Sequence, residues 1–155
     1  MLFVFDLDFT LWDAGGTWCD HTVAPYIKQN GHIRDAEGRR IILYPEVRSI
    51  LESLQGKEIL MGLASRTHRP DSARLLLELF GISHFIRFQQ IYPGSKIQHF
   101  QALNKESGIP FVNMYFYDDE HRNIEEVSSL GVHARRIDAG LSWYDVKDHL
   151  LWEKY

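Results

Sequence analysis

The sequence that decides the fold stands at the start of the chain and reads Leu2-Phe3-Val4-Phe5-Asp6-Leu7-Asp8-Phe9-Thr10-Leu11-Trp12. Its unbroken apolar run is typical of a strand buried on both faces of a parallel sheet. Asp6 and Asp8 follow, and side chains two positions apart at a strand end share one face. We therefore expect both carboxylates at the carboxyl end of the first strand, where ligands bind in open α/β sheets.

Two neighbouring carboxylates repel one another, and one of them is driven towards its neutral form unless a cation lies between them. A hard divalent ion with oxygen ligands, Mg²⁺ above all, removes this conflict. With the metal bound, one carboxylate can act as a nucleophile and the other can transfer a proton. The alternative is that Asp6 and Asp8 only form a turn that caps the next segment, and the rest of the chain decides between the two interpretations.

The composition is that of an ordinary globular protein. The chain has 155 residues, of which 45% are hydrophobic and 25% charged, and this length suits one compact domain. The net charge of −4 and the lack of a Lys/Arg run do not indicate a nucleic-acid partner. The single cysteine, Cys19, excludes an internal disulfide and fits a reducing compartment. Asp6 and Asp8 interrupt the early apolar run, so neither a secretory signal nor a membrane span is expected, and we predict a cytoplasmic monomer.

Strands and helices are expected to alternate along the rest of the chain. Further strands are predicted at 59–64, 85–92, 114–117 and 132–137, and helices at 45–56, 70–81, 96–105, 123–130 and 143–152. This alternation predicts one α/β domain over residues 1–155, with a doubly wound, Rossmann-like parallel sheet flanked by helices. Residues 12–40, here called the flap, are irregular and rich in turn residues, and Asn30-Gly31 favours a hairpin within them.

Three of the predicted apolar strands end in polar residues. Ser65-Arg66 follows the second strand, Asp118-Asp119 follows a later one, and Lys96 begins a helix. Parallel strands present their carboxyl ends at one edge of the sheet, so these side chains should converge with the first acidic pair. Carboxylates suit Mg²⁺, whereas guanidinium, ammonium and N–H donors suit phosphate oxygens. The set predicts a site for Mg²⁺ and a phosphoryl group.

In this order, the motifs resemble those of haloacid dehalogenase (HAD)-type phosphatases and, more closely, the magnesium-dependent phosphatase-1 family. The stretches that carry the resemblance are the opening one above, Leu43-Tyr44-Pro45-Glu46-Val47, Ala64-Ser65-Arg66-Thr67, Ile91-Tyr92-Pro93-Gly94-Ser95-Lys96 and Phe116-Tyr117-Asp118-Asp119-Glu120-His121-Arg122-Asn123-Ile124. The resemblance covers residues 1 to about 140. The chain departs from the family pattern at Phe9, where Tyr is usual, and across the flap, which leaves the choice of substrate open.

The resemblance implies how the reaction proceeds. Asp6 would attack phosphorus and carry a transient aspartyl phosphate. Asp8 would protonate the leaving oxygen and then accept a proton from the hydrolytic water. Ser65 and the backbone N–H groups of Leu7 and Asp8 would bind phosphate oxygens. Positioning and charge neutralisation suffice for phosphoryl transfer without a cofactor other than Mg²⁺.

The resemblance also implies the cationic and metal-binding groups. Lys96 would neutralise charge between the nucleophile and the phosphate, and Arg66 would bind phosphate or substrate. The implied protein ligands of Mg²⁺ are Asp6, the backbone carbonyl of Asp8, and Asp119, with Asp118 in support. Whether Asp118 or Asp119 binds the metal directly stays open, and Asp119 is favoured.

Each of these residues also has a simpler interpretation. The simpler roles are a turn cap for Ser65, a surface salt bridge for Arg66, a solvated helix-start lysine for Lys96 and helix N-capping for Asp118-Asp119. Three aromatic residues of the flap either pack within it or face the substrate, namely Trp12, Trp18 and Tyr26.

The substrate is predicted from the lack of room for a cap. The segments between Asp8, Ser65 and Lys96 are filled by predicted strands and helices of the core, so no separate cap domain is expected. An open site, covered at most by the flap, would accept bulky phosphomonoesters, including phosphotyrosine on proteins, as well as sugar phosphates, and the resemblance points to phosphotyrosine and to phosphorylated sugars or glycated amines. We therefore predict a Mg²⁺-dependent phosphomonoester hydrolase that works through an aspartyl phosphate.

Other functions fit part of the pattern. A receiver-like signalling domain also gathers acidic residues and a lysine around Mg²⁺, but its phosphorylated Asp ends a middle strand, where this chain has Ser65-Arg66. A phosphosugar phosphotransferase would need a closed cap. A catalytically inactive scaffold is disfavoured because every expected group is present.

Overall fold

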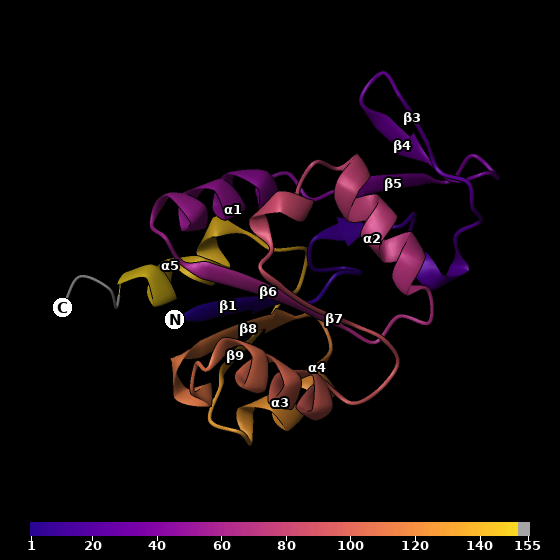
Figure 1. Ribbon diagram of the computed structural model, residues 1–155. Coiled ribbons are helices and arrows are strands. Elements are labelled where there is room, and N and C mark those ends of the chain that lie inside the picture. The colour runs from indigo at the N-terminus through magenta and orange to yellow at the C-terminus, as the bar shows by residue number, and fades with distance from the viewer. Residues whose placement is uncertain (152–155) are drawn as a thin grey trace.

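The computed structural model describes residues 1–151 and contains a parallel sheet covered by helices on both faces (Figure 1). This sheet has the strand order β7-β6-β1-β8-β9, and all its neighbouring strands are parallel. The strands are β1 (Leu2–Phe5), β6 (Leu60–Ser65), β7 (Phe88–Ile91), β8 (Met114–Asp118) and β9 (His133–Arg136). The predicted α/β class with a parallel, Rossmann-like sheet is confirmed.

The helices fall into two layers (Figure 1). Their bounds are α1 (Val47–Gly56), α2 (Pro70–Leu79), α3 (Lys96–Ser107), α4 (His121–Ser128) and α5 (Trp143–Leu151), with short 3-10 helices η1 (Cys19–His21), η2 (Ser83–Phe85) and η3 (Phe111–Asn113). One apolar cluster joins the sheet to α1, α2 and α5, and a second joins it to α3 and α4.

The position of β1 in the centre of the sheet explains why all its residues are apolar. Phe3 and Phe5 belong to the first apolar cluster, whereas Leu2 and Val4 belong to the second. All four side chains are fully buried, because successive residues of a strand point to opposite faces and both faces are covered. The strand therefore places Asp6 at the edge of the sheet where its neighbours β6 and β8 also end.

The flap is more regular than the sequence predicts. It contributes β2 (Trp12–Asp13), β3 (Ile27–Gln29) and β4 (His32–Arg34), which join β5 (Arg40–Leu43) in an antiparallel sheet of order β2-β5-β4-β3. The predicted hairpin is present, because Asn30-Gly31 connects β3 to β4 with positive φ angles of 53° and 76°. Strands of two to four residues carry too little periodicity to be recognised from sequence.

Several predicted boundaries shift. The strand predicted from residue 85 begins at Phe88, because η2 occupies the residues before it. Helix α1 begins at Val47 rather than at Pro45. The last helix is described to Leu151, and the predicted end at Trp152 lies outside the described residues. Within residues 1–151, no helix has the length and apolar character needed to cross a membrane.

Candidate active site

The loop after β1 turns sharply and keeps its two carboxylates at the end of the sheet. The carbonyl of Leu7 accepts hydrogen bonds from the backbone N–H groups of Thr10 and Leu11, at 3.0 and 2.8 Å. Phe9 adopts a left-handed backbone conformation, with φ of 62°, to make this turn. The turn directs Asp6 and Asp8 into one cavity of about 380 Å³.

The cavity brings together most of the predicted site residues. Its lining includes Asp6, Asp8, Ser65, Arg66, Lys96 and Asp119. Two predicted site residues are not part of the lining: the side chains of Asp118 and Leu7 are fully buried. The convergence follows from topology, since β1, β6 and β8 are adjacent parallel strands that end at the same edge.

Lys96 lies at the start of α3 with its ammonium group among acceptors. Its Nζ is 3.0 Å from Asp6 Oδ1 and 3.2 Å from Asp118 Oδ2, and it also donates to the carbonyl of Ala64. Its side chain is only 1% exposed, so the interpretation as a solvated lysine is wrong. Burial lowers the pKa of Lys96, but the two carboxylates raise it more, and the net pKa is above its usual value.

Asp118 and Asp119, at the end of β8, lie in different environments. Asp118 accepts hydrogen bonds from the Glu120 N–H at 2.8 Å and from Asn123 Nδ2 at 2.9 Å, so both of its oxygens are engaged within the protein. Asp119 lines the cavity instead. Burial, opposed by a hydrogen bond with Asp6, raises the pKa of Asp119 to about 6.

This acidic group fits a divalent cation. Carboxylate oxygens of Asp6, Asp118 and Asp119 lie within 4.8 Å of one another. Burial and then the charge of Asp118 raise the pKa of Asp6 well above its usual range, although Lys96 opposes this shift. Asn123 Oδ1 is buried without a hydrogen-bond partner in the described part of the chain, and Asn123 lines the same cavity. Hard oxygen donors with an excess of negative charge suit Mg²⁺.

Asp8 has a different environment from Asp6. Its Oδ1 accepts hydrogen bonds from Trp12 Nε1 and from the Cys19 backbone N–H, both at 2.8 Å. Burial raises the pKa of Asp8 even though these two donors lower it. Because both donors point at the same oxygen, Oδ2 is left to hold or release a proton. Trp12 is thus a buried support for Asp8 rather than a substrate-facing residue.

Several donors at the cavity have unused hydrogen-bonding capacity. Ser65 Oγ accepts from the Thr67 N–H at 3.3 Å, which leaves its O–H free to donate. Arg66 forms an ion pair with Glu126 at 2.7 Å, and its buried Nε has no hydrogen-bond partner among residues 1–151. No hydrogen bond from the backbone N–H of Leu7 or Asp8 is found in the same residues.

The cavity also contains residues that the sequence interpretation missed. They are Asp20, Thr67, His68, Pro93, Gly94, Glu120, Arg122 and Asn123. Some of these lie inside the stretches quoted for the resemblance, so their position was a usable signal. Asp20 lies in the flap, where no motif marks it. Of the three aromatic residues left open above, Trp12 and Tyr26 are buried, whereas Trp18 is 48% exposed at the cavity.

Sequence comparisons match most of the chain. The family model described as Acid Phosphatase matches residues 1–154. Magnesium-dependent phosphatase 1 of Homo sapiens is 46% identical over 143 residues, covering 91% of this chain and 80% of the human protein. A HAD-like hydrolase superfamily protein of Schizosaccharomyces pombe is 37% identical over 142 residues, covering 83% of this chain and 80% of the yeast protein.

Solved structures share the fold. An uncharacterized protein from Listeria monocytogenes serotype 4b superposes with a TM-score of 0.72 at 15% identity, covering 99% of both chains. The N-terminal part of a Bacteroides fragilis protein, which contains a phosphatase domain and was solved with Mg, superposes with a TM-score of 0.62 at 16% identity. It covers 99% of this chain and 39% of that one.

Proposed function

Because the chain belongs to the acid phosphatase family and is a magnesium-dependent phosphatase of the HAD superfamily, we propose that it hydrolyses phosphomonoesters through an aspartyl phosphate on Asp6. The observation that carries this proposal is the contrast between two carboxylates in one cavity. Asp6 lies 3.0 Å from the Lys96 ammonium, whereas Asp8 is held by two N–H donors on one oxygen. With Mg²⁺ bound, the first environment suits a charged nucleophile, and the second suits a group that gives and takes a proton.

The proposed reaction has two steps. An oxygen of Asp6 forms a bond to phosphorus while the bond from phosphorus to the leaving oxygen breaks, and Asp8 gives that oxygen its proton. A water molecule then forms a new bond to phosphorus as the bond to Asp6 breaks, and Asp8 takes the water's proton. The products are the alcohol and inorganic phosphate, and both carboxylates return to their starting state.

The remaining site residues would bind the phosphoryl group and the metal. Mg²⁺ would be held by Asp6, the backbone carbonyl of Asp8 and Asp119, with Asp118 in support, and when bound it supplies positive charge to the phosphoryl oxygens. The phosphoryl oxygens would be bound by the Ser65 O–H, the Leu7 and Asp8 N–H groups and the Arg66 guanidinium, and Lys96 would neutralise charge between Asp6 and the phosphate. The engagement of both Asp118 oxygens by protein donors supports Asp119 as the direct ligand.

We infer from the rim of the cavity that phosphotyrosine and sugar phosphates are substrates. Trp18 is 48% exposed at the cavity, and an indole ring can stack on an aromatic or sugar ring. Arg66, His68 and Arg122 line the same cavity and can bind the oxygens of a substrate. The relatives that match most of the chain are named as a phosphatase and a hydrolase, which supports phosphatase activity more than a receiver-like domain or a phosphosugar phosphotransferase. Cytoplasmic location and a monomeric state stay predictions from the sequence.

Turnover with and without metal tests the proposal. Wild-type protein should hydrolyse p-nitrophenyl phosphate with Mg²⁺, stop in EDTA and recover when Mg²⁺ is restored. Asp6→Asn should remove turnover while the circular dichroism spectrum stays unchanged, because an amide cannot act as the nucleophile. Turnover by Asp6→Asn at the wild-type rate would refute the proposal. For the substrate class, a phosphotyrosyl peptide and free phosphotyrosine should be hydrolysed with similar kcat/KM, and rejection of the peptide would refute an open site.

A further inference from the structure

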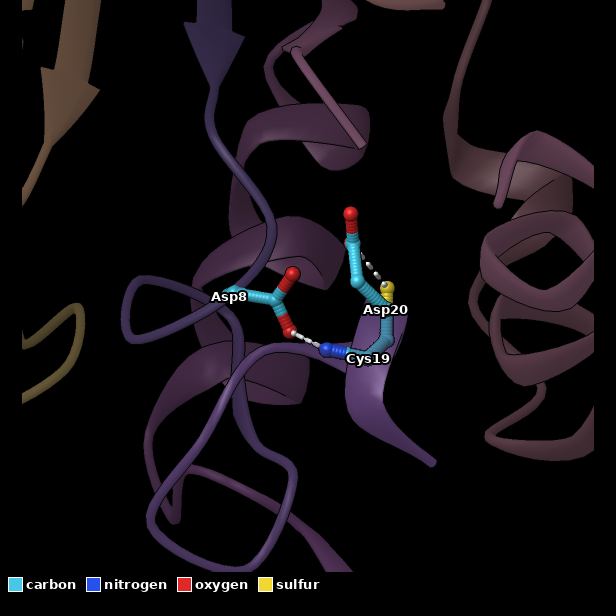
Figure 2. Close-up of side chains that lie close together, drawn as sticks. All are labelled: Asp8, Cys19 and Asp20. Carbon is cyan, nitrogen blue, oxygen red and sulfur yellow. Dashed lines mark hydrogen bonds between the residues drawn. The ribbon is translucent and has the colours of Figure 1, made fainter. Parts of the chain in front are cut away.

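The 3-10 helix η1 of the flap lies between two parts of the site. Figure 2 shows Asp8 on the loop after β1, with the Cys19 backbone nitrogen directed at its carboxylate and Asp20 on the same turn. The Cys19 N–H donates to Asp8 Oδ1 at 2.8 Å. This contact connects the flap to the group that we place in proton transfer.

Asp20, the next residue, holds the loop that follows β6. Its Oδ1 accepts a hydrogen bond from the Thr67 O–H, and its Oδ2 accepts one from the His68 backbone N–H at 3.0 Å. The Thr67 backbone N–H in turn donates to Ser65 Oγ at 3.3 Å. Asp20 is therefore one hydrogen-bonded residue away from the hydroxyl that we place on the phosphate.

The hydrogen bonds of this group distinguish it from the cation site described above. Ligand atoms of Asp8, Cys19 and Asp20 lie within 4.8 Å of one another. However, Asp8 Oδ1 and both Asp20 oxygens already accept N–H or O–H donors, and a cation there would have to displace them. Burial raises the pKa of the Cys19 thiol, which also keeps it from acting as a thiolate ligand.

We propose that Asp20 is a positioning residue that sets the orientation of Asp8 and Ser65 together. By attaching η1 to the loop after β6, it keeps the Cys19 N–H on Asp8 Oδ1, so that Asp8 Oδ2 faces the leaving oxygen with its proton. Through Thr67 it also fixes the Ser65 hydroxyl. This inference rests on the proposed function, because it assumes that Asp8 protonates the leaving group.

Leaving-group dependence is a readout that loss of stability alone would not change. p-Nitrophenolate is a stable anion and leaves phosphorus without being protonated, whereas the alkoxide of glycerol must receive a proton as it leaves. In Asp20→Ala, kcat/KM for glycerol phosphate should fall by about 10²-fold, since a small misplacement of a catalytic group has effects of this size. The fall with p-nitrophenyl phosphate should be much smaller, and the inhibition constant of inorganic phosphate should rise.

Two further variants separate positioning from folding. Asp20→Asn should recover most of the glycerol phosphate activity, because an amide can accept from the His68 N–H and donate to Thr67 Oγ1. Thr67→Val removes the hydroxyl that donates to Asp20 Oδ1 and contacts Cys19 Sγ, while every residue of the flap stays the same. It should change the ratio of the two activities in the same direction as Asp20→Ala.

Asp35 provides the matched control. It is a buried flap carboxylate that accepts backbone N–H donors from Val23, Glu37 and Arg39 at 2.8–3.1 Å, and it does not line the cavity. Asp35→Ala should lower thermal stability but leave the ratio of the two activities at the wild-type value. Equal losses on both substrates in Asp20→Ala, or the same changed ratio in Asp35→Ala, would overturn the inference.

Asp8→Asn shows which assumption has failed. In this variant kcat/KM, which reports the steps up to the first phosphoryl transfer, should fall far more with glycerol phosphate than with p-nitrophenyl phosphate. If it does so and Asp20→Ala does not, the inference about Asp20 is wrong and the proposed function stands. If kcat/KM of Asp8→Asn falls equally on both substrates, the role of Asp8 as proton donor to the leaving oxygen is wrong, and the inference falls with it.

Discussion

Lys96 shows how a single residue sets the charge balance of the site. Its ammonium is buried, and a buried lysine without anions would lose its proton. Asp6 and Asp118 prevent this, at 3.0 and 3.2 Å from Nζ. One ammonium offsets only part of the charge of three neighbouring carboxylates, the third being Asp119. In the absence of metal, the site therefore has an excess of negative charge.

This excess predicts that removing the nucleophile stabilises the metal-free protein. The raised pKa of Asp6, caused first by burial and then by Asp118, means that its charged form is destabilised by folding. Asp6→Asn keeps an oxygen for Lys96 but removes the charge. In EDTA at neutral pH, we expect its Tm to rise by about 2–4 °C, which corresponds to about 1 kcal/mol for a chain of this size.

Asp35→Asn is the control for this prediction. Burial alone would raise the pKa of Asp35. The hydrogen bonds from the backbone N–H groups of Val23, Arg39 and Glu37 lower it by more than burial raises it, so the charged form of Asp35 is stabilised by folding. The same change of side chain should therefore lower Tm at Asp35. A fall in Tm for both variants, measured by thermal unfolding in EDTA, would contradict the charge balance described here.

At the residue scale, the sequence predicted the acidic and cationic groups but not what supports them. Asp6, Lys96 and Asp119 could be predicted because each follows or begins a regular element, and parallel topology then brings them together. The partners of Asp8 could not. Trp12 Nε1 and the Cys19 N–H reach Asp8 only because of the path that the flap takes. Almost every residue has a backbone N–H, so the residue type does not show which one donates.

At the scale of elements, the junction between β7 and α3 contains a buried titratable group. His99 of α3 is fully buried, and its Nε2 hydrogen-bonds the Tyr92 carbonyl at 2.9 Å. Its Nδ1 has no hydrogen-bond partner in the described residues. Burial lowers the pKa of His99 to about 4, although the bond to Tyr92 opposes the shift.

This shift makes the packing of α3 sensitive to acid. The unfolded chain, with a histidine pKa near 6.5, binds the proton that the folded state excludes, so stability is full above that pH and falls as the pH drops towards 4. The contribution is at most about 3 kcal/mol. His99→Gln, which keeps a donor for Tyr92, should reduce the difference in unfolding free energy between neutral pH and about pH 4.5. Urea unfolding at the two pH values measures this, and an unchanged difference would contradict it.

The strands also differ in how well they could be predicted from the sequence. Strand β1 was predictable because burial on both faces requires an apolar residue at every position. The flap strands β2, β3 and β4 were not, apart from the hairpin turn at Asn30-Gly31, because each spans only two or three residues. The flap nevertheless supplies Trp18 and Asp20 to the lining of the cavity, so the part hardest to predict also contributes to the candidate site.

For the molecule as a whole, the core sheet supplies the residues that we propose for the chemistry, and the flap supplies part of their surroundings. The carboxyl ends of β1, β6 and β8 carry the proposed nucleophile and the proposed phosphate-binding groups into a cavity of about 380 Å³. This division explains why the order of motifs identified the reaction class while the substrate stayed a proposal. It also places the central claim on a single residue, the proposed nucleophile Asp6.

Trapping the intermediate tests that claim most directly. In Asp8→Asn, p-nitrophenyl phosphate can still transfer its phosphoryl group because its leaving group needs no proton, whereas the water of the second step lacks its base. We predict a burst of p-nitrophenol in the presence of Mg²⁺, and acid quenching followed by peptide mass spectrometry should place one phosphoryl group on Asp6. A phosphoryl group on another residue, or a burst without any protein-bound phosphoryl group, would contradict the account.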